Sequence, residues 1–404
     1  MRILMVNKFL YPNGGSETYI FKLGEELGRK GHEVEYFGME HEGRIVGNRV
    51  GSYTGRMDFH TGKWGKLLYP FKIVYSVEAR KKIRKVLEDF VPDVVHLNNF
   101  NFQLTPSIIY EIRNFDKRHK RKTALVYTAH DYQWVCPNHM FRIPKKGELC
   151  MRCAKEGFWN CMKYRCIHNS WIKSVIGSIE GTLYNSLKTY RKVDKIICPS
   201  EFMNRALSFH SVLRGKTVTL HNFIDEAKDG QEVEKKEYVL YFGRYSEEKG
   251  VKTLLEVCRH LPEVSFVFAG SGPLKEEIGT CPNIRDTGFL SGEELKKMVQ
   301  EARFVVFPSE WYENCPFSVM EAQTYRTPVV ASGLGGTSEL VRHGITGELF
   351  EGGNQDDLKG KILKLWKDKE LCRKYAENCR EIGFDTLEEY TDKVLAIYHQ
   401  ILKH

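Results

Sequence analysis

The sequence has no uninterrupted apolar stretch long enough to span a bilayer, and no signal peptide is visible at its start. Residues 1–6 lead directly into a polar turn. A membrane-spanning helix needs about 20 predominantly apolar residues, so this class of protein is excluded. We therefore expect a cytoplasmic protein.

The composition also lacks the bias of a disordered or fibrous chain. Of the 404 residues, 42% are hydrophobic and 12% are aromatic, which is enough to bury a large core. Disordered and fibrous classes are excluded, and this length is more natural for two domains than for one.

Negative charge is scarce in the first half of the chain. Residues 1–200 contain 34 Lys and Arg against 19 Asp and Glu, whereas residues 201–404 contain 27 against 33. Such an excess is typical of contact with nucleic acid or an anionic membrane surface. The basic and aromatic segment 64–75 favours the inner membrane face, with a solvated helix face as the alternative. The cations that follow it are Arg80, Lys81, Lys82, Arg84 and Lys85.

Short apolar runs alternate with helix-length periodic segments along the whole chain. Residues 3–6 form the first run, a glycine turn follows, and apolar residues then recur at helical spacing until Gly31. This pattern predicts βαβ units and parallel sheets. Further strands are expected at 34–37, 94–97, 124–128, 195–198 and 218–221, and helices at about 76–90 and 105–115.

The second half repeats the alternation after a polar, acidic stretch at 225–236, which is expected to link two domains. Strands are expected at 238–242, 265–269, 304–307 and 328–331, and helices near 249–260, 292–302 and 316–325. We predict Rossmann-like domains over 1–224 and 225–385, and a C-terminal helix over 386–404 that could pack back on the first domain.

Two glutamates eight positions apart lie in the stretch 308–322. Pro316 suits the first turn of a helix, which places Glu321 within the helix and Glu313 in the loop before it. The start of a helix favours a phosphate or sugar hydroxyls, and a carboxylate can accept two hydrogen bonds from a ribose diol. Two unrelated surface glutamates are the alternative.

Three glycine turns that follow expected strands support a ligand site in this half. Arg244 and Lys249 lie in the first turn, where they can neutralise a diphosphate and stabilise the charge of a leaving group. Gly270 and Gly272, a partial glycine-loop signal, let the backbone approach a ligand. Residues 335–339 open a helix at the same edge of the sheet, where ligands of open α/β sheets bind.

The matching edge of the first half carries two candidate features. Gly14 and Gly15 follow the first strand, and His130 follows a later one. Both ends are predicted to face the second domain across a cleft. A core residue or a capping group is the alternative for His130.

Together these stretches resemble the retaining glycosyltransferases of family 4, and the resemblance covers nearly the whole chain. Its most specific element is the EX7E spacing of Glu313 and Glu321. It implies the GT-B fold, in which two Rossmann-like domains with parallel sheets face each other across a cleft. The implied catalytic residues are His130, Arg244, Lys249 and Glu313. The implied donor-binding residues are Gly14, Gly15, Gly270, Gly272, Asn314, Cys315, Pro316, Phe317, Ser318 and Glu321.

The resemblance also implies a mechanism. Glu313 would contact the sugar of a nucleoside-diphosphate donor, Glu321 the ribose, and Arg244 and Lys249 the diphosphate. His130 would orient the donor and not act as a nucleophile. The leaving diphosphate can accept the proton of the acceptor, so no catalytic metal is implied. The acceptor would be a glycan or lipid-linked glycan in the synthesis of a surface polysaccharide.

The chain departs from the family pattern at two places, and other functions stay open. His221 to Asp225 stands where Asn-Gly-Ile-Asp is common, and Cys315 to Ser318 varies a Pro-Phe-Gly run, so the donor sugar is uncertain. A nucleotide-sugar epimerase or hydrolase on the same scaffold is the alternative enzyme. A nucleic-acid-binding protein stabilised by a zinc ion is a third possibility. It would leave the EX7E pair unexplained, so we expect no nucleic acid partner.

Five of the eleven cysteines fall within a predicted insertion at about 132–170. Four thiolates at short spacings suit a tetrahedral structural zinc. Free thiols, a redox-sensitive cluster and an iron–sulfur cluster are the alternatives. The insertion follows His130 and is expected to shape the acceptor side of the cleft. The expected ligands are Cys150, Cys153, Cys161 and Cys166, and the fifth cysteine is Cys136.

Overall fold

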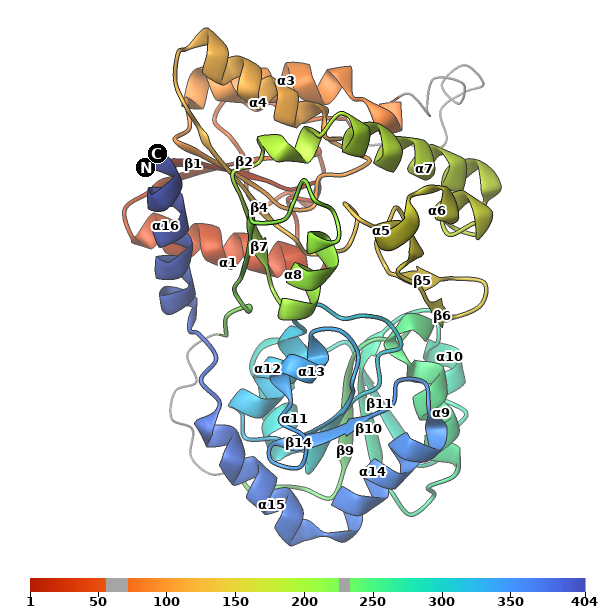
Figure 1. Cartoon of the computed structure of the whole chain (residues 1–404). Helices are drawn as coiled ribbons and strands as arrows, with labels where there is room; N and C mark the ends of the chain where they lie inside the picture. The colour runs from red at the N-terminus through yellow and green to blue at the C-terminus, as the bar shows by residue number, and fades with distance from the viewer. Residues whose placement is uncertain (56–71, 225–232, 404) are drawn as a thin grey trace. The chain divides into compact units, whose positions relative to one another are not determined.

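The computed structural model describes residues 1–55, 72–224 and 233–403, which divide into two compact units. The first unit contains Met1–Leu220 together with Leu387–His404, and the second contains His221–Thr386. Each unit is built on its own sheet of six parallel strands (Figure 1). The two sheets confirm the predicted α/β class with one parallel sheet in each half.

The sheet of the first unit has the strand order β2-β1-β3-β4-β7-β8. Its strands are β1 (Arg2–Val6), β2 (Glu33–Phe37), β3 (Val94–Leu97), β4 (Ala124–Thr128), β7 (Lys195–Cys198) and β8 (Thr217–Thr219). Every residue of β3 and β4 is buried. Continuous apolar runs of this kind are expected where helices cover both faces of a parallel sheet.

The helices of the first unit begin at residues that cap them. Ser76, Ser170 and Ser200 each precede a helix, and each hydroxyl accepts a hydrogen bond from the N–H group three residues further on. Figure 1 shows α3 and α4 above the sheet and α1 below it. The helices are α1 (Gly15–Arg29), α3 (Val77–Phe90), α4 (Ser107–Arg118), α7 (Trp171–Ser186), α8 (Glu201–Ser208) and α16 (Leu387–Leu402).

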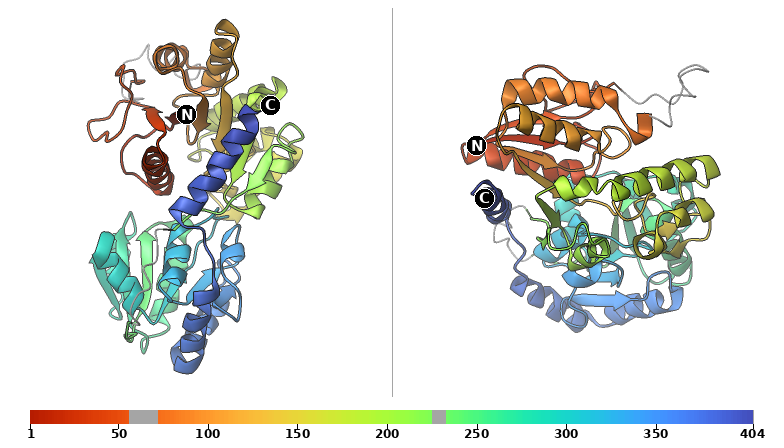
Figure 2. Two further views of the ribbon diagram at one scale, coloured as in Figure 1. Left: turned by 90° about the vertical axis from the view of Figure 1, so that its left-hand side faces the viewer. Right: turned by 45° about the horizontal axis from the view of Figure 1, so that its top comes forward.

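The last helix, α16, completes the first unit. It packs against α1 and β4 (Figure 2). Tyr390, Val394, Tyr398 and Ile401 are buried, and their spacing places them on one face of the helix. An amphipathic helix from the end of the chain therefore covers part of the N-terminal sheet.

A small substructure lies between β4 and α7. It contains the antiparallel hairpin of β5 (Arg142–Ile143) and β6 (Glu148–Leu149), followed by α5 (Arg152–Glu156) and α6 (Trp159–Lys163). Its core consists of Ile143 and Phe158 together with three cysteines. Thiol groups therefore fill much of the space that larger apolar side chains occupy in other cores.

The second unit has the strand order β11-β10-β9-β12-β13-β14. Its strands are β9 (Val239–Arg244), β10 (Phe266–Ser271), β11 (Ile284–Gly288), β12 (Phe304–Phe307), β13 (Val329–Ser332) and β14 (Gly347–Phe350). Val239 and Tyr241 belong to one core cluster, and Leu240 and Phe242 to another. Alternate residues of a strand point to opposite faces, so this sheet has an apolar core on each side.

Helices cover the second sheet and connect its strands. They are α9 (Val251–Arg259), α10 (Lys275–Ile278), α11 (Gly292–Glu301), α12 (Phe317–Thr324), α13 (Thr337–Leu340), α14 (Gln355–Lys367) and α15 (Lys369–Asn378). A 3-10 turn, η2 (Glu247–Lys249), precedes α9.

The two outermost strands of this sheet were not expected from the sequence. The edge strand β11 reads IRDTG, which lacks an apolar run. In β14, Glu348 is fully buried, where the Tyr375 hydroxyl donates to it at 2.7 Å and Lys361 and Lys364 pair with it. A search for apolar periodicity does not detect a strand whose buried position is a glutamate with three partners.

The features that suggested a membrane surface are only partly described. The described part of the chain leaves out residues 64–71 of the basic and aromatic segment. It also leaves out residues 225–232 of the expected linker. Of the five cations after that segment, Arg80 and Arg84 bind the buried carboxylate of Glu111. Among the described residues, no helix is long and apolar enough to cross a membrane.

Candidate functional site

The strand order of the second unit identifies one candidate position for a binding site, at the carboxyl edge of its sheet. From β9 the chain moves outward to β10 and β11, and then returns to place β12 on the other side of β9. In an open parallel sheet, ligands bind where the strand order reverses in this way. The residues that follow β9 and β12 are therefore the first candidates for a binding site.

Glu313 lies in the loop after β12 and accepts three hydrogen bonds. Its Oε1 lies 2.6 Å from Lys249 Nζ, 2.7 Å from Ser309 Oγ and 2.6 Å from Trp311 Nε1. The Glu313 side chain is only 8% exposed, against 27% for Lys249. Lys249 and Glu313, which the sequence indicated separately, are thus in direct contact, and the carboxylate is held in one orientation by donors from two loops.

Two glycines allow the loops around this pair to pack closely. Gly250 has φ +70°, and a Cβ atom there would lie 1.8 Å from the Pro308 carbonyl oxygen. Gly335 has φ +62°, and its Cβ would lie 2.3 Å from the Glu313 carbonyl oxygen, to which the N–H of Gly336 donates at 2.7 Å. A side chain at either glycine would displace the backbone that carries Lys249 or Glu313.

The turn at 270–272 lies beside the turn that carries Arg244. Gly270 pairs with Gly243, and Ser271 pairs with Arg244, in the β9–β10 ladder. A Cβ atom at Gly270 would lie 1.9 Å from the Gly243 carbonyl oxygen. Arg244 is exposed at this edge, so the structure brings two of the three predicted turns together around a cation.

Helix α12 begins as the sequence predicts, with Pro316 just before its first residue. The first N–H groups of a helix have no intrahelical acceptor and remain available to a ligand. Glu321 lies in the second turn and is partly buried. Burial raises the pKa of the Cys315 thiol to about 12, and its sulfur accepts a hydrogen bond from the N–H of Asn222 at 3.3 Å. Cys315 therefore packs the loop and is no nucleophile at neutral pH.

In the first unit, the strand order reverses between β1 and β3. There Asn7 donates to Glu17, which is 2% exposed, and accepts from the N–H of Asn99 at 3.0 Å. Gly14 caps the N-terminus of α1, and Gly15 is its first residue. Sequence reasoning found the glycines but missed Asn7, Glu17 and Asn99, because single polar residues after strands give no periodic signal.

His130 follows β4 in the same unit. Its Nε2 lies 2.9 Å from Asn98 Oδ1, and its ring meets that of Tyr19 edge to face at 4.8 Å. Desolvation lowers the pKa of His130 to about 3. The ring is therefore neutral at physiological pH, where it can hydrogen-bond to a ligand without carrying charge.

A buried chain of hydrogen bonds behind His130 was not anticipated. His96 Nδ1 lies 2.6 Å from the Tyr398 hydroxyl, and His96 Nε2 lies 2.7 Å from Thr128 Oγ1. Thr128 in turn contacts the hydroxyl of Tyr19, which is bonded to that of Tyr390 at 2.9 Å. Two tyrosines of α16 thereby fix the strand end that precedes His130.

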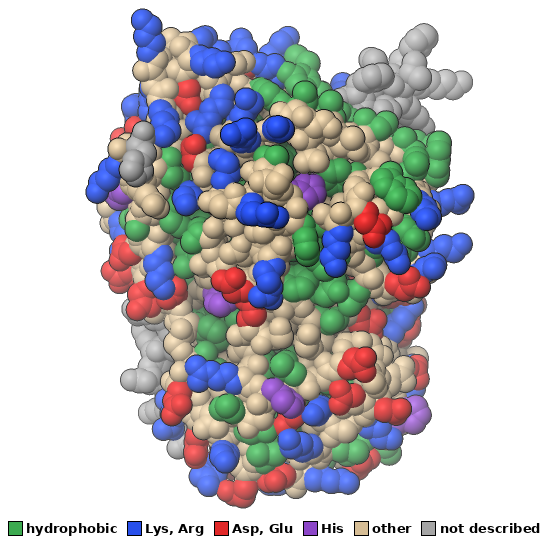
Figure 3. All heavy atoms as spheres, in the orientation of Figure 1, with side chains coloured by type: hydrophobic (Ala, Val, Ile, Leu, Met, Phe, Trp, Pro, Cys, Tyr) green, Lys and Arg blue, Asp and Glu red, His purple; other side chains and the backbone are tan. Residues whose placement is uncertain are grey.

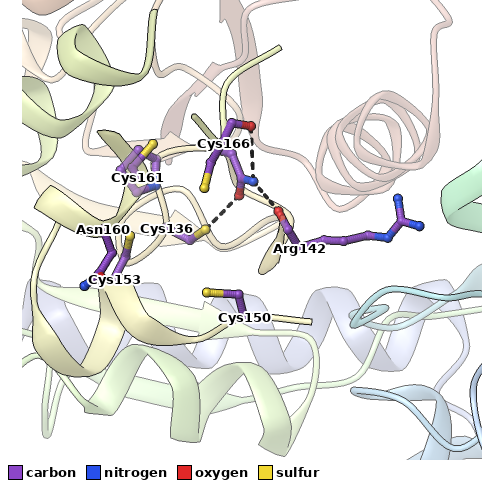
Figure 4. A pocket seen from close by; sticks show the side chains of 9 residues that line it. Cys136, Arg142, Cys150, Cys153, Asn160, Cys161 and Cys166 are labelled. Atoms are coloured by element: carbon purple, nitrogen blue, oxygen red, sulfur yellow. Dashed lines mark hydrogen bonds between the residues drawn. The ribbon is translucent and has the colours of Figure 1, made fainter. Parts of the chain in front are cut away.

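Five cysteines line one cavity in the inserted substructure (Figure 4). All are free thiols, and four of the five are buried. Within the described residues, no group of three or more His, Cys, Asp or Glu side chains is already arranged to hold a metal ion. The cysteines are Cys136, Cys150, Cys153, Cys161 and Cys166.

Comparisons with known proteins match both units. The model of Glycosyltransferase Family 4 matches residues 13–228, and that of the glycosyl transferases group 1 matches residues 222–382. The chain is 21% identical to O-antigen chain mannosyltransferase C of Escherichia coli over 418 residues, which cover 100% of this chain and 99% of the relative. It is 30% identical to alpha-D-kanosaminyltransferase of Streptomyces kanamyceticus over 176 residues, which cover 40% of this chain and 45% of the relative.

The match covers less than two thirds of some relatives. Besides the 45% of the kanosaminyltransferase, the aligned region covers 62% of the length of a second relative and 30% of the length of a third. Among solved structures, that of Anabaena HepE in complex with UDP is similar with a TM-score of 0.67 and 17% identity, and the alignment covers 99% of this chain and 100% of HepE. This likeness agrees with the two-sheet fold.

Proposed function

Because the chain belongs to Glycosyltransferase Family 4, whose model matches residues 13–228, we propose that it transfers a sugar from a nucleoside-diphosphate donor to a glycan or lipid-linked glycan acceptor. The observation that carries this proposal is the contact between Lys249 and Glu313 at the carboxyl edge of the sheet, where the strand order reverses at β9 and β12. A cation and a carboxylate held together there are suited to a ligand that has both a phosphate and sugar hydroxyls.

The donor would bind in the second unit through the residues around this pair. Arg244 and Lys249 bind the diphosphate and stabilise its charge as it leaves, since Lys249 is a mobile point charge that can move from Glu313 to a phosphate oxygen. Glu313 contacts the sugar and Glu321 the ribose. The remaining contacts come from the backbone at Gly270 and Gly272, from the loop residues Asn314, Cys315 and Pro316, and from Phe317 and Ser318 at the start of α12.

In the first unit, Gly14 and Gly15 would approach a phosphate, and His130 would hydrogen-bond the donor sugar. A neutral His130 with Nε2 bonded to Asn98 can present its other ring nitrogen to a hydroxyl group. Transfer proceeds with retention of the anomeric configuration, the leaving diphosphate accepts the proton of the acceptor, and no catalytic metal takes part.

The wider role that we propose is the synthesis of a surface polysaccharide at the inner membrane face. It is supported by the full-length likeness to an O-antigen mannosyltransferase. In the view of Figure 3, Lys and Arg side chains are numerous over the first unit, which suits an anionic membrane or a lipid diphosphate acceptor. The complex of HepE with UDP makes UDP-sugars the first donors to test.

The decisive experiment is thermal unfolding of the full chain with UDP-, GDP-, ADP- and TDP-sugars. A ligand at about 100 times its Kd stabilises the native state by roughly 2.7 kcal/mol. We expect one donor to raise the Tm of the wild type and of Lys252→Ala, and to lose most of this effect on Lys249→Ala and Glu321→Ala. Lys252 is the matched control, because it lies three residues from Lys249 but pairs on the exposed surface with Glu247. If no sugar nucleotide changes the Tm, the proposal is wrong.

Product analysis then separates transfer from the alternative reactions. Incubation of the stabilising donor with and without a glycan acceptor distinguishes a new glycoside from a free sugar or an epimerised donor. We expect a new glycoside, and Glu313→Gln is expected to reduce its rate by at least tenfold with donor binding largely retained.

A further inference from the structure

The cavity in the inserted substructure has an unusual set of donors. In the described structure its lining contains five thiol groups but no carboxylate and no imidazole. Its volume is about 10 Å³, which leaves room for roughly one water-sized particle. Thiolates are the soft ligands that zinc and iron–sulfur clusters prefer, and a space of this size fits a single ion better than a cluster.

Cys136 reaches this cavity from the loop that follows β4, and not from the hairpin or helices of the insertion. It lies six residues after His130, and its N–H donates to the Tyr132 carbonyl at 2.7 Å. The preceding Trp134 is stacked between Tyr127 of β4 at 3.9 Å and Tyr190 at 4.0 Å. Cys136 is thus part of the packed loop that begins at His130.

The five sulfur atoms are not equivalent. Figure 4 shows the side chains of Cys136, Cys150, Cys153 and Cys166 around a common space, with Cys161 at its far side.

A cation next to the cavity would offset part of the charge of a metal with four thiolates. A zinc ion with four thiolate ligands has a net charge of −2, which is costly to bury alone. The Arg152 guanidinium lies 3.8 Å from the sulfur of Cys150, whereas the side chain of Arg142 points away from the cysteines (Figure 4).

We propose that Cys136, Cys150, Cys153 and Cys166 bind one structural zinc ion, with Cys161 outside the ligand set. The sequence alone had favoured Cys161 in place of Cys136. Binding would draw the sulfurs inward, because they are not yet at coordinating positions. With Cys136 as a ligand, the metal connects the loop that carries His130 to the insertion. An effect of this connection on catalysis rests on the proposed function, but the metal site does not.

The first test is the metal content of the full chain, purified under reducing conditions without chelators. We expect about one zinc per chain and no stoichiometric iron or sulfide in the wild type, in Cys161→Ala and in Cys198→Ala. Cys198 is the matched control, because it is fully buried in the same unit but does not line the cavity. For Cys136→Ala we expect zinc release to a chromogenic chelator at least ten times faster than from Cys198→Ala.

Cobalt substitution of Cys161→Ala keeps the test independent of whether Cys136→Ala folds. This variant leaves only four of the five cysteines at the cavity. A thiolate-to-cobalt absorption of the intensity expected for four ligands would therefore require Cys136 to be one of them.

Three results would overturn the inference. They are the absence of stoichiometric zinc from the wild type, iron and sulfide in its place, or loss of the metal from Cys161→Ala with retention in Cys136→Ala. Zinc binding without any response to sugar nucleotides would instead contradict the proposed function and leave the metal site intact.

Discussion

Glu180 provides a quantitative test of the first unit, because its carboxyl group is buried without a cation. It lies in α7, its side chain is 2% exposed, and its Oε1 has no hydrogen-bond partner among the described residues. Burial raises the pKa of Glu180 from 4.5 to about 8. At pH 7 the folded chain therefore holds a proton that the unfolded chain has released.

The sign of the pH dependence follows from this difference. Since the folded-state pKa is the higher one, the unfolding free energy is largest below pH 4.5 and falls until about pH 8. At 1.36 kcal/mol per pH unit, the loss between pH 4.5 and 7 is on the order of 3 kcal/mol. Glu180→Gln removes the titration, so we expect it to be more stable than the wild type at pH 7, with a difference that grows toward pH 8.

The assay is thermal unfolding of both proteins between pH 5 and 8. For a unit of this size, a change of 1 kcal/mol shifts the Tm by roughly 2–4 °C, so the expected separation at pH 7 is well above the error of the method. Parallel Tm curves for the two proteins, or a variant that is less stable at every pH, would refute the reasoning, because either result would mean that Glu180 is ionised and paired.

Three further substitutions test other parts of the structure. Glu111→Gln should have the opposite effect to Glu180→Gln, because hydrogen bonds from two arginines of α3 outweigh burial and lower the pKa of Glu111. The ionised carboxylate therefore stabilises the fold above pH 4.5, and this stabilisation is lost as the pH falls through the lowered pKa. We expect the variant to have a lower Tm than the wild type at pH 7 and a similar Tm in acid. Gly250→Ala should lower the Tm and weaken donor binding, because its φ of +70° and the nearby Pro308 carbonyl leave no room for a methyl group. Unchanged donor binding in calorimetry would contradict the described packing. Tyr398→Phe should cost about 1–3 kcal/mol in urea unfolding, since it leaves His96 Nδ1 buried without its partner.

The sequence predicted the fold well where apolar runs were continuous. Strands β3, β4 and β12 have the bounds that alternation of strands and helices indicated. It failed where polar residues are buried in pairs, as in β14 with Glu348, because periodicity assumes that buried positions are apolar. Helix α7 was also missed: two serines, two glycines and a glutamate stand on its buried face beside Tyr184, so that face gives no apolar periodicity.

For the candidate site, the sequence identified residues whose type and spacing were distinctive. The contact of Lys249 with Glu313 joins two motifs that are 64 residues apart. Ser309 and Trp311, which also bind Glu313, were missed because serine and tryptophan have no spacing rule that marks them as its partners. Cys136 was set apart because it is distant in sequence from the other four cysteines, although all five line one cavity.

The position of α16 has a consequence for the order in which the chain folds during synthesis. The first unit includes residues from both ends of the chain, whereas the second is one continuous segment. At about 5–20 residues per second, a ribosome takes roughly 8–30 s to make the intervening segment. During that time Tyr19 lacks its partner Tyr390, and His96 lacks its partner Tyr398. The nascent N-terminal half is therefore exposed to proteases and chaperones until translation ends, and the continuous second half is free to fold first.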